Sequence, residues 1–263
     1  MKETVWKRKK LSLLLALFFA ATWGVAFAEN LKDDNDILAL ENFSGSVALT
    51  NDYVFRGISQ TDEDPAIQGS FDYGHPSGFY LGVWASNVDE SISKGNVEMD
   101  LYIGYARELF EDFSFDISAI YYYYPGGGDG PEPDFIEGHL GLGYTFSDMA
   151  LTPTLGVGYY YSPDFFGEDG NAHYVNGTLG LTLPYGFNLS GELGYQDVEG
   201  DKTTGNGLGK EGGNGFDYTH WRIGLSKEIK GFELDLSYHD TNEEEFLGDI
   251  ADSRVVFTLS RTF

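Results

Sequence analysis

Histidine is the residue type in this chain with the clearest catalytic chemistry. An imidazole at His139, His220 or His239 could act as a general base and activate a serine hydroxyl for hydrolysis. Spacing along a sequence does not place such a triad, and a histidine on a polar strand face more often serves as a hydrogen-bonded polar residue. The chain contains no cysteine, which excludes thiol nucleophiles, thiolate metal sites, iron–sulfur clusters and disulfides.

Clustered carboxylates are a second candidate for chemistry, because hard cations such as calcium prefer oxygen ligands. Such clusters occur at 62–64, at 164 with 168 and 169, and at 243–245. None of these clusters has the spacing of a helix–loop–helix calcium site. We therefore interpret them as solvated acidic loops. The glycine-rich stretch 205–210 resembles a phosphate-binding loop in composition, but no strand leads through it into a helix, so we interpret it as a flexible loop.

Charge and the N-terminal segment restrict the function further. The 263-residue chain carries 16 basic and 42 acidic residues, a formal net charge of −26, whereas nucleic acid is held mainly by lysine and arginine. Four basic residues at 7–10, an apolar run at 11–21 and the small residues of 26–28 (Ala-Phe-Ala) predict a cleaved secretory signal peptide over 1–28. Its removal takes away five basic residues and one acidic residue, which leaves 11 and 41 and a net charge of −30.

The remaining chain predicts an all-β protein. Residues 29–44 are polar and acidic and are interpreted as a periplasmic N-terminal leader, and no later stretch is long and apolar enough for a transmembrane helix. From Val47 onward, apolar residues recur at every second position, which is the period of β-strands. Twelve strands are predicted, at about 45–56, 67–74, 79–86, 97–107, 113–124, 135–145, 151–161, 174–183, 187–196, 218–227, 232–240 and 253–263.

The two faces of these strands differ sharply. One face is apolar, includes Tyr53 and Phe55 in the first predicted strand, and has Arg261 as its one charged residue. Alternation alone fits a soluble sandwich as well as a barrel. The opposite face holds the charged and imidazole side chains Asp52, Arg56, Asp72, Glu98, Asp100, Asp116, Glu137, His139, Glu192, His220, Arg222, Glu233, Asp235, His239 and Arg254.

The connections favour a barrel over a sandwich. Long and short connections alternate along the twelve predicted strands, as in outer-membrane barrels with short periplasmic turns and long external loops. Outward aromatic residues cluster near both strand ends, which is typical of membrane interfaces. The chain ends in Phe263 after alternating apolar residues, which resembles the C-terminal signal read by the bacterial outer-membrane assembly machinery; Pro153 weakens the seventh predicted strand near its start.

The polar face predicts a narrow acidic passage. Nine glycines fall on it and leave room inside, at 82, 104, 141, 143, 156, 158, 180, 194 and 224. Its nine acids exceed its three arginines, so a pore here would prefer cations or neutral solutes. Asp52, Arg56 and Gln60 lie at the long-loop end of the first predicted strand, where they would line a constriction or fix the loop in a structural network. The candidate pore-lining residues are Asp52, Arg56, Asp72, Glu98, Asp100, Asp116, Glu137, His139, Glu192, His220, Arg222, Glu233, Asp235 and His239.

Several sequence blocks resemble a known family. They are 44–61 (SGSVALTNDYVFRGISQT), 64–74 (DPAIQGSFDYG), 78–88 (GFYLGVWASNV), 98–105 (EMDLYIGY) and 184–195 (PYGFNLSGELGY). These blocks resemble the TorF family of porins, conserved bacterial proteins of unknown function. The resemblance implies an outer-membrane barrel with a role in transport, and it brings no catalytic residues or substrate.

These observations together predict a transmembrane antiparallel up-and-down β-barrel over 45–263, acting as a porin-like channel for passive diffusion of small hydrophilic solutes. The expected partners are outer-membrane lipid, the assembly machinery and small solutes or cations, with no nucleic acid and no cofactor. A homo-oligomer is neither supported nor forbidden. The alternatives are a non-conducting structural or adhesive barrel whose acidic loops bind divalent ions, and an outer-membrane hydrolase that uses histidine and serine.

Overall fold

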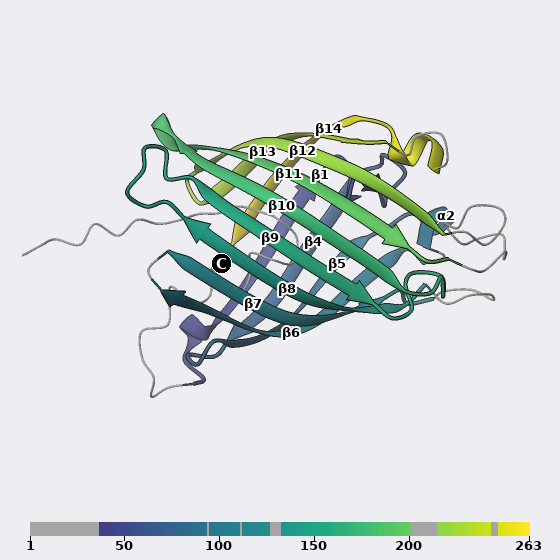
Figure 1. The fold of residues 1–263 in the computed structure, drawn as a ribbon, viewed down its shortest axis with the longest axis horizontal. Coiled ribbons are helices and arrows are strands. Elements are labelled where there is room, and N and C mark those ends of the chain that lie inside the picture. Colours follow the sequence, from purple (N-terminus) through teal and green to yellow (C-terminus); the bar gives the residue numbers. More distant parts are fainter. Residues whose placement is uncertain (1–36, 94, 111, 127–132, 201–214, 243–246) are drawn as a thin grey trace, which may run out of the picture.

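The chain folds into a closed barrel of twelve antiparallel strands in the computed structural model (Figure 1). The structure describes residues 37–93, 95–110, 112–126, 133–200, 215–242 and 247–263. Each barrel strand pairs with its neighbours along the chain, and β1 closes the cylinder by pairing with both β14 and β4. The predicted fold class is therefore confirmed.

The barrel strands are β1 (Phe43–Thr50), β4 (Ala66–Gly74), β5 (Phe79–Asn87), β6 (Val97–Phe110), β7 (Phe113–Tyr123), β8 (Phe135–Thr145), β9 (Thr154–Ser162), β10 (Ala172–Leu183), β11 (Phe187–Val198), β12 (Phe216–Ile229), β13 (Phe232–Thr241) and β14 (Arg254–Thr262). Two short strands, β2 (Val54–Phe55) and β3 (Ile58–Ser59), pair only with each other. The helical turns are η1 (Leu40–Asn42), α2 (Glu90–Ser93), η2 (Pro184–Gly186) and η3 (Gly248–Ala251). None of the helices in the described ranges has the length and hydropathy needed to cross a membrane.

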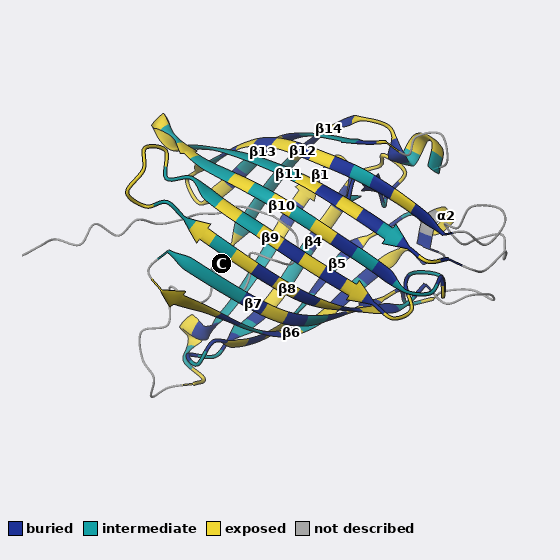
Figure 2. Cartoon of the chain, in the orientation of Figure 1, coloured by how far each residue is buried: buried dark blue, intermediate teal, exposed yellow. Residues whose placement is uncertain are grey.

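Burial alternates along the strands as the sequence predicted (Figure 2). In β8, Glu137 and His139 face the inside and are buried, whereas Ile136 and Leu140 face outward and are 47% and 43% exposed. The outward face is an apolar belt that lipid covers, because a soluble protein rarely exposes so large an apolar surface. Arg261 lies at the short-turn end of this face, where its guanidinium stacks over the rings of Phe232 and Phe263.

The prediction for the first strand, 45–56, is wrong at its end. β1 stops at Thr50, and the chain then turns into the lumen, so Tyr53 is 2% exposed and Phe55 packs against Tyr122 instead of facing lipid. The physical reason is a tight hairpin between β2 and β3. Its two central residues, Arg56 and Gly57, have φ of 48° and 85°, which is the left-handed geometry of a two-residue hairpin turn.

The seventh predicted strand, 151–161, starts later than expected. β9 begins at Thr154, because Leu151 and Thr152 have positive φ angles of 66° and 42° and Pro153 has no amide hydrogen for the ladder. The connection 146–153 is therefore longer than the other short turns. It remains at the same end of the barrel as the turns 75–78, 184–186 and 230–231.

Inward glycines receive the side chains of neighbouring strands rather than leaving empty space everywhere. Tyr80 on β5 lies opposite Gly104 on β6, and Gly82 lies opposite Tyr102, so each ring covers the glycine across the ladder. A side chain at either glycine would overlap the tyrosine ring. The absence of a side chain at these glycines thus gives the inward tyrosine rings room to lie against the barrel wall.

The outward face provides a test of lipid contact. Ile117→Arg, near the middle of β7 on the outward face, is expected to lower the free energy of unfolding by about 2–4 kcal/mol in lipid vesicles, measured by urea titration. Leu109→Arg near the end of β6 is the matched control and is expected to cost at most about 1 kcal/mol, because the cost falls toward the interface. Equal effects at both depths would contradict a membrane-spanning belt.

The glycine–tyrosine packing provides a second test. Gly104→Ala places a methyl group against the ring of Tyr80 and is expected to lower the free energy of unfolding by about 1–3 kcal/mol. Gly138→Ala is the control, because a Cβ there meets no atom within 4 Å. If the two alanine variants unfold at the same urea concentration, the packing argument fails.

Candidate functional site

The interior of the barrel is the candidate site, and one segment of the chain crosses it. Residues 52–61, which we call the inward segment, contain the β2–β3 hairpin and run from the end of β1 into the lumen. The hairpin tip lies against β12, three strands away from β1 around the barrel: a Cβ on Gly57 would be 2.6 Å from Cβ of His220. Only glycine permits this approach, in both space and backbone conformation.

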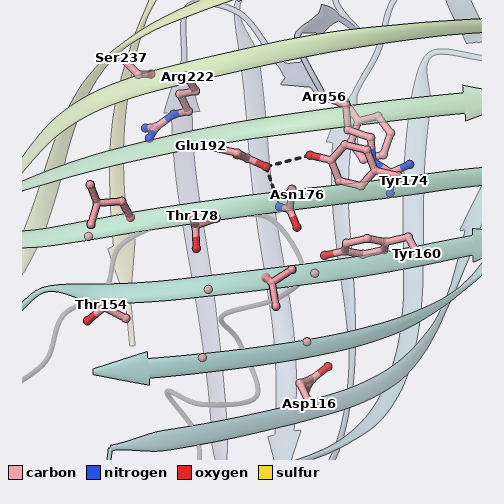
Figure 3. A pocket seen from close by; sticks show the side chains of 18 of the residues that line it. Arg56, Asp116, Thr154, Tyr160, Tyr174, Asn176, Thr178, Glu192, Arg222 and Ser237 are labelled. Atoms are coloured by element: carbon pink, nitrogen blue, oxygen red, sulfur yellow. Dashed lines mark hydrogen bonds between the residues drawn. The ribbon is translucent and has the colours of Figure 1, made fainter. Parts of the chain in front are cut away.

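Arg56 fixes the tip of the inward segment to the wall formed by β8 to β11. Its Nη1 and Nη2 donate to Oε1 and Oε2 of Glu137 at 2.9 and 2.7 Å, and Nη1 also donates to Oε1 of Gln196 at 2.8 Å. The guanidinium lies 4.0 Å from the ring centroid of Tyr174 and 4.9 Å from that of Tyr160 (Figure 3). These added contacts are what a buried ion pair needs, because the two charges alone do not offset their loss of water.

Asp52 fixes the other end of the same segment. Its carboxylate accepts hydrogen bonds from the hydroxyls of Ser59 at 2.7 Å and Thr61 at 2.9 Å, and from Nη1 of Arg254 at 2.8 Å. Arg254 also donates to the backbone carbonyls of Asp249 and Asp252. The segment is thereby tied to the loop that precedes β14, across the seam where the barrel closes.

Tyrosine hydroxyls satisfy many of the other inward carboxylates. Tyr53 donates to Glu98 at 2.6 Å, Tyr80 to Asp116 at 2.8 Å, and Tyr174 to Glu192 at 2.9 Å. Tyr102 donates to Asp72, and Tyr122 donates to Glu137 at 3.1 Å. Sequence reasoning missed these tyrosines as site residues, although all except Tyr53 stand at inward positions of the predicted alternation, which is the signal that could have identified them.

The histidines do not form the arrangement that the alternative hydrolase function would need. Nδ1 of His139 lies 2.9 Å from Oδ1 of Asp116 and 3.3 Å from Oγ of Ser118, so both partners meet the same ring nitrogen. A hydrolytic triad needs the acid and the serine on opposite nitrogens. Nε2 of His220 contacts the Tyr174 hydroxyl at 2.9 Å, and Nε2 of His239 contacts Ser237 at 3.1 Å.

The remaining predicted residues lie toward the short-turn end. Arg222 donates to Asp235 at 2.7 Å and to the Ser190 hydroxyl at 2.8 Å. Glu233 is buried on β13, two residues from Asp235 on the same inward face. Among the described residues, no three His, Asp or Glu side chains are grouped so that they could hold a metal ion. The acidic cluster at 243–245 and the glycine-rich stretch 205–210 lie outside the described residues.

The long-loop half of the lumen is filled by buried side chains. We call these buried side chains the aromatic cluster; Tyr53 and Ile58 of the inward segment belong to it. Phe165 from the β9–β10 connection packs on Phe135 with ring centroids 4.8 Å apart, which adds a second loop to the filling. The cluster consists of Tyr53, Ile58, Ala66, Trp84, Val88, Ile120, Tyr122, Tyr124, Phe135, Tyr160, Phe165, Ala172, Tyr174, Val198, Phe216 and Tyr218.

A cavity of about 480 Å³ occupies the rest of the lumen, between the inward segment and the short-turn end. One wall consists of small residues of β8, β9 and β10, including Gly156 and Thr178 (Figure 3). The cavity reaches the exposed residues Glu108 and Ser147 at the short-turn rim. The candidate residues that line it are Asp52, Arg56, Asp100, Asp116, Glu192, His220, Arg222, Asp235 and His239, while Asp72, Glu98, Glu137, His139 and Glu233 lie behind this lining.

The Arg56–Glu137 pair provides a test of how the inward segment is held. Arg56→Met and Glu137→Gln each leave one buried group without its partner, so each is expected to lower the free energy of unfolding by about 3–5 kcal/mol. The double variant should cost clearly less than the sum, because neither charge remains unpaired. Urea unfolding in lipid vesicles measures the cycle. Arg261→Met on the outward face is the control, and additive effects of the two buried changes would contradict the pairing.

Solved structures with a similar fold are outer-membrane porins. A NanC porin structure aligns with a TM-score of 0.52 and 10% sequence identity, over 84% of this chain and 98% of that chain. A KdgM porin structure, in complex with disordered oligogalacturonate, aligns with a TM-score of 0.53 and 8% identity, over 84% and 97% of the two chains. At such low identity the likeness establishes the fold alone, a closed β-barrel like those of these porins. No curated protein matches the sequence.

A family model matches almost the whole described chain. The model is that of a bacterial protein of unknown function, Gcw_chp, and it matches residues 39–263. This match does not confirm the TorF name suggested by the sequence blocks. It does confirm the expected class, conserved bacterial proteins of unknown function. The chain belongs to the Gcw_chp family.

Proposed function

We propose that this protein is an outer-membrane channel for passive diffusion of small hydrophilic solutes, with a preference for cations or neutral molecules. The observation that carries the proposal is the cavity of about 480 Å³ inside a porin-type barrel, lined by charged and hydroxyl side chains and continuous with the short-turn rim. Lumen-facing polar groups and a lipid-facing apolar belt are the arrangement of channel-forming barrels.

The charges of the lumen support the ion preference. Of the nine predicted inward acids, Glu137, Asp52 and Asp235 form ion pairs with arginine. The other six meet tyrosine, serine, asparagine or histidine side chains or, as in Asp100, leave an oxygen without a partner among the described residues. A cavity with surplus carboxylates attracts cations and repels anions. The candidate residues that line the cavity are proposed to contact solutes. Of those behind the lining, Glu98 and Glu137 hold the inward segment through Tyr53 and Arg56.

The solute class differs from that seen with one similar structure. The KdgM porin was solved with oligogalacturonate, a chain of sugars that each carry a carboxylate. The surplus acids of the lumen described above would repel such a polyanion. We therefore assign to this barrel small cationic or neutral solutes.

We also propose that the protein is not an enzyme. The His139 arrangement lacks an acid and a serine on opposite ring nitrogens, as described above, and the similar solved structures are porins. The second candidate function is a non-conducting structural or adhesive barrel. The aromatic cluster favours it, because these side chains fill the long-loop half of the lumen.

Planar-bilayer recording of the refolded protein separates the two functions. Stable unitary conductance steps are expected, with a reversal potential in a potassium chloride gradient that shows cation preference. The double variant Asp116→Asn with Glu192→Gln is expected to reduce that preference, because both carboxylates line the cavity.

Glu228→Gln is the matched control for this experiment, because Glu228 is exposed at the end of β12 and does not line the cavity. Well-folded protein without conductance steps would favour the structural barrel. Anion preference in the unaltered protein would overturn the proposed selectivity.

A further inference from the structure

Asp100 is an inward carboxylate that has no cationic partner among the described residues. It lies on β6, lines the cavity and is only 7% exposed, and its Oδ1 accepts no hydrogen bond from the described residues. None of the ion pairs between described residues includes it. A buried carboxylate in this state is unfavourable unless a positive group or a donor reaches it.

Aromatic rings surround this carboxylate. Asp100 lies directly opposite Trp84 on β5 and Tyr122 on β7 in the ladder, and Tyr102 follows two residues later on the same face of β6. Tyr53 from the inward segment adds a fourth ring, with its centroid 5.3 Å from that of Trp84. All four rings line the same cavity as Asp100, and the faces of such rings attract cations.

The basic side chains of the cavity already have acidic partners. Arg56 is bound to Glu137, and Arg222 is bound to Asp235. The residue before Asp100 on the inward face of β6 is another acid, Glu98, so the neighbourhood stays negative. Both arginines that line the cavity are thus engaged by other acids, so a bound cationic solute would supply the charge that Asp100 lacks.

The ring of aromatic residues indicates which cation fits. A metal ion such as calcium requires several oxygen ligands, and no described group of acids is arranged to supply them. A diffuse charge with an apolar surface, as in a quaternary ammonium or a protonated amine, suits one carboxylate and several ring faces. The cavity of about 480 Å³ lies in the range of ordinary small-molecule sites.

We propose that Asp100, Trp84, Tyr102, Tyr122 and Tyr53 form a binding site for small organic cations, the Asp100 site. The proposal rests on the proposed channel function and names the solute class that the channel selects. The carboxylate supplies the charge, the rings supply the desolvated surface, and the inward segment completes the site by contributing Tyr53.

Choline binding tests the proposal. The matched control ligand is the uncharged isostere of choline, in which a tert-butyl group replaces the trimethylammonium group. Trp84 is the fluorescent reporter in detergent-solubilised protein in which the other three tryptophans of the sequence, Trp6, Trp23 and Trp221, are replaced by phenylalanine. Trp221 is 40% exposed on the outward face. Choline is expected to change the fluorescence saturably, and the isostere to bind roughly tenfold or more weakly. Equal affinities for the two ligands, or no saturable response to choline, would overturn the proposal.

Variants locate the charge that is responsible. Asp100→Asn is expected to weaken choline binding roughly tenfold while leaving binding of the isostere unchanged. Glu108→Gln, which removes a carboxylate from the far rim of the same cavity, is the control and should bind choline as the parent does. If Asp100→Asn binds choline as tightly as the parent, the site is wrong; if that variant does not fold, the comparison of the two ligands on the parent decides.

Conductance recorded on the same preparations separates this proposal from the channel function. Unitary steps without choline binding would keep the channel and overturn the Asp100 site. Choline binding without unitary steps would keep the site and overturn the channel.

Discussion

The structure depends on the closure of one sheet with lipid on its outer side. Because no water reaches the backbone within a bilayer, every amide and carbonyl must find a partner, and a closed antiparallel ladder supplies those partners without an edge. The same closure sends every second side chain into the lumen, where many of the polar ones are buried. β8 shows the consequence: Leu140 and Ile136 meet lipid, while Glu137 and His139 must be satisfied inside.

Satisfying the interior explains the inward segment and the tyrosines. An unpartnered carboxylate is costly in such a space, and pairing each one with arginine would require more basic residues than the chain has inside. Tyrosine solves the problem with a neutral donor on a large apolar ring, as Tyr80 does for Asp116 and Tyr174 for Glu192. The glycines that those rings cover, Gly104 under Tyr80 and Gly194 under Tyr174, are then part of the charge arrangement, because they give the rings room to lie against the wall.

Most of the fold could be predicted from the sequence, because alternation, turn residues and the lengths of connections are local and the barrel repeats them. The predicted inward position of Glu137 follows from the alternation of inward and outward residues along the strand alone. The end of β1 could not be predicted in this way, since alternation continues through residues 51–56 although the chain has left the sheet. That departure is fixed by partners far away in sequence, Glu137 for Arg56 and Arg254 for Asp52, which no local pattern reveals.

The unequal filling of the two halves of the lumen also follows from these long-range contacts. The inward segment enters from the long-loop end, so its Tyr53 and Ile58 join the aromatic cluster there, and the glycine-rich wall of β8 to β10 leaves the cavity at the other end. Arg56 lies at the boundary, between the Tyr174 ring and the cavity. In the proposed channel a solute would pass the hairpin tip, which the Arg56–Glu137 ion pair holds in place.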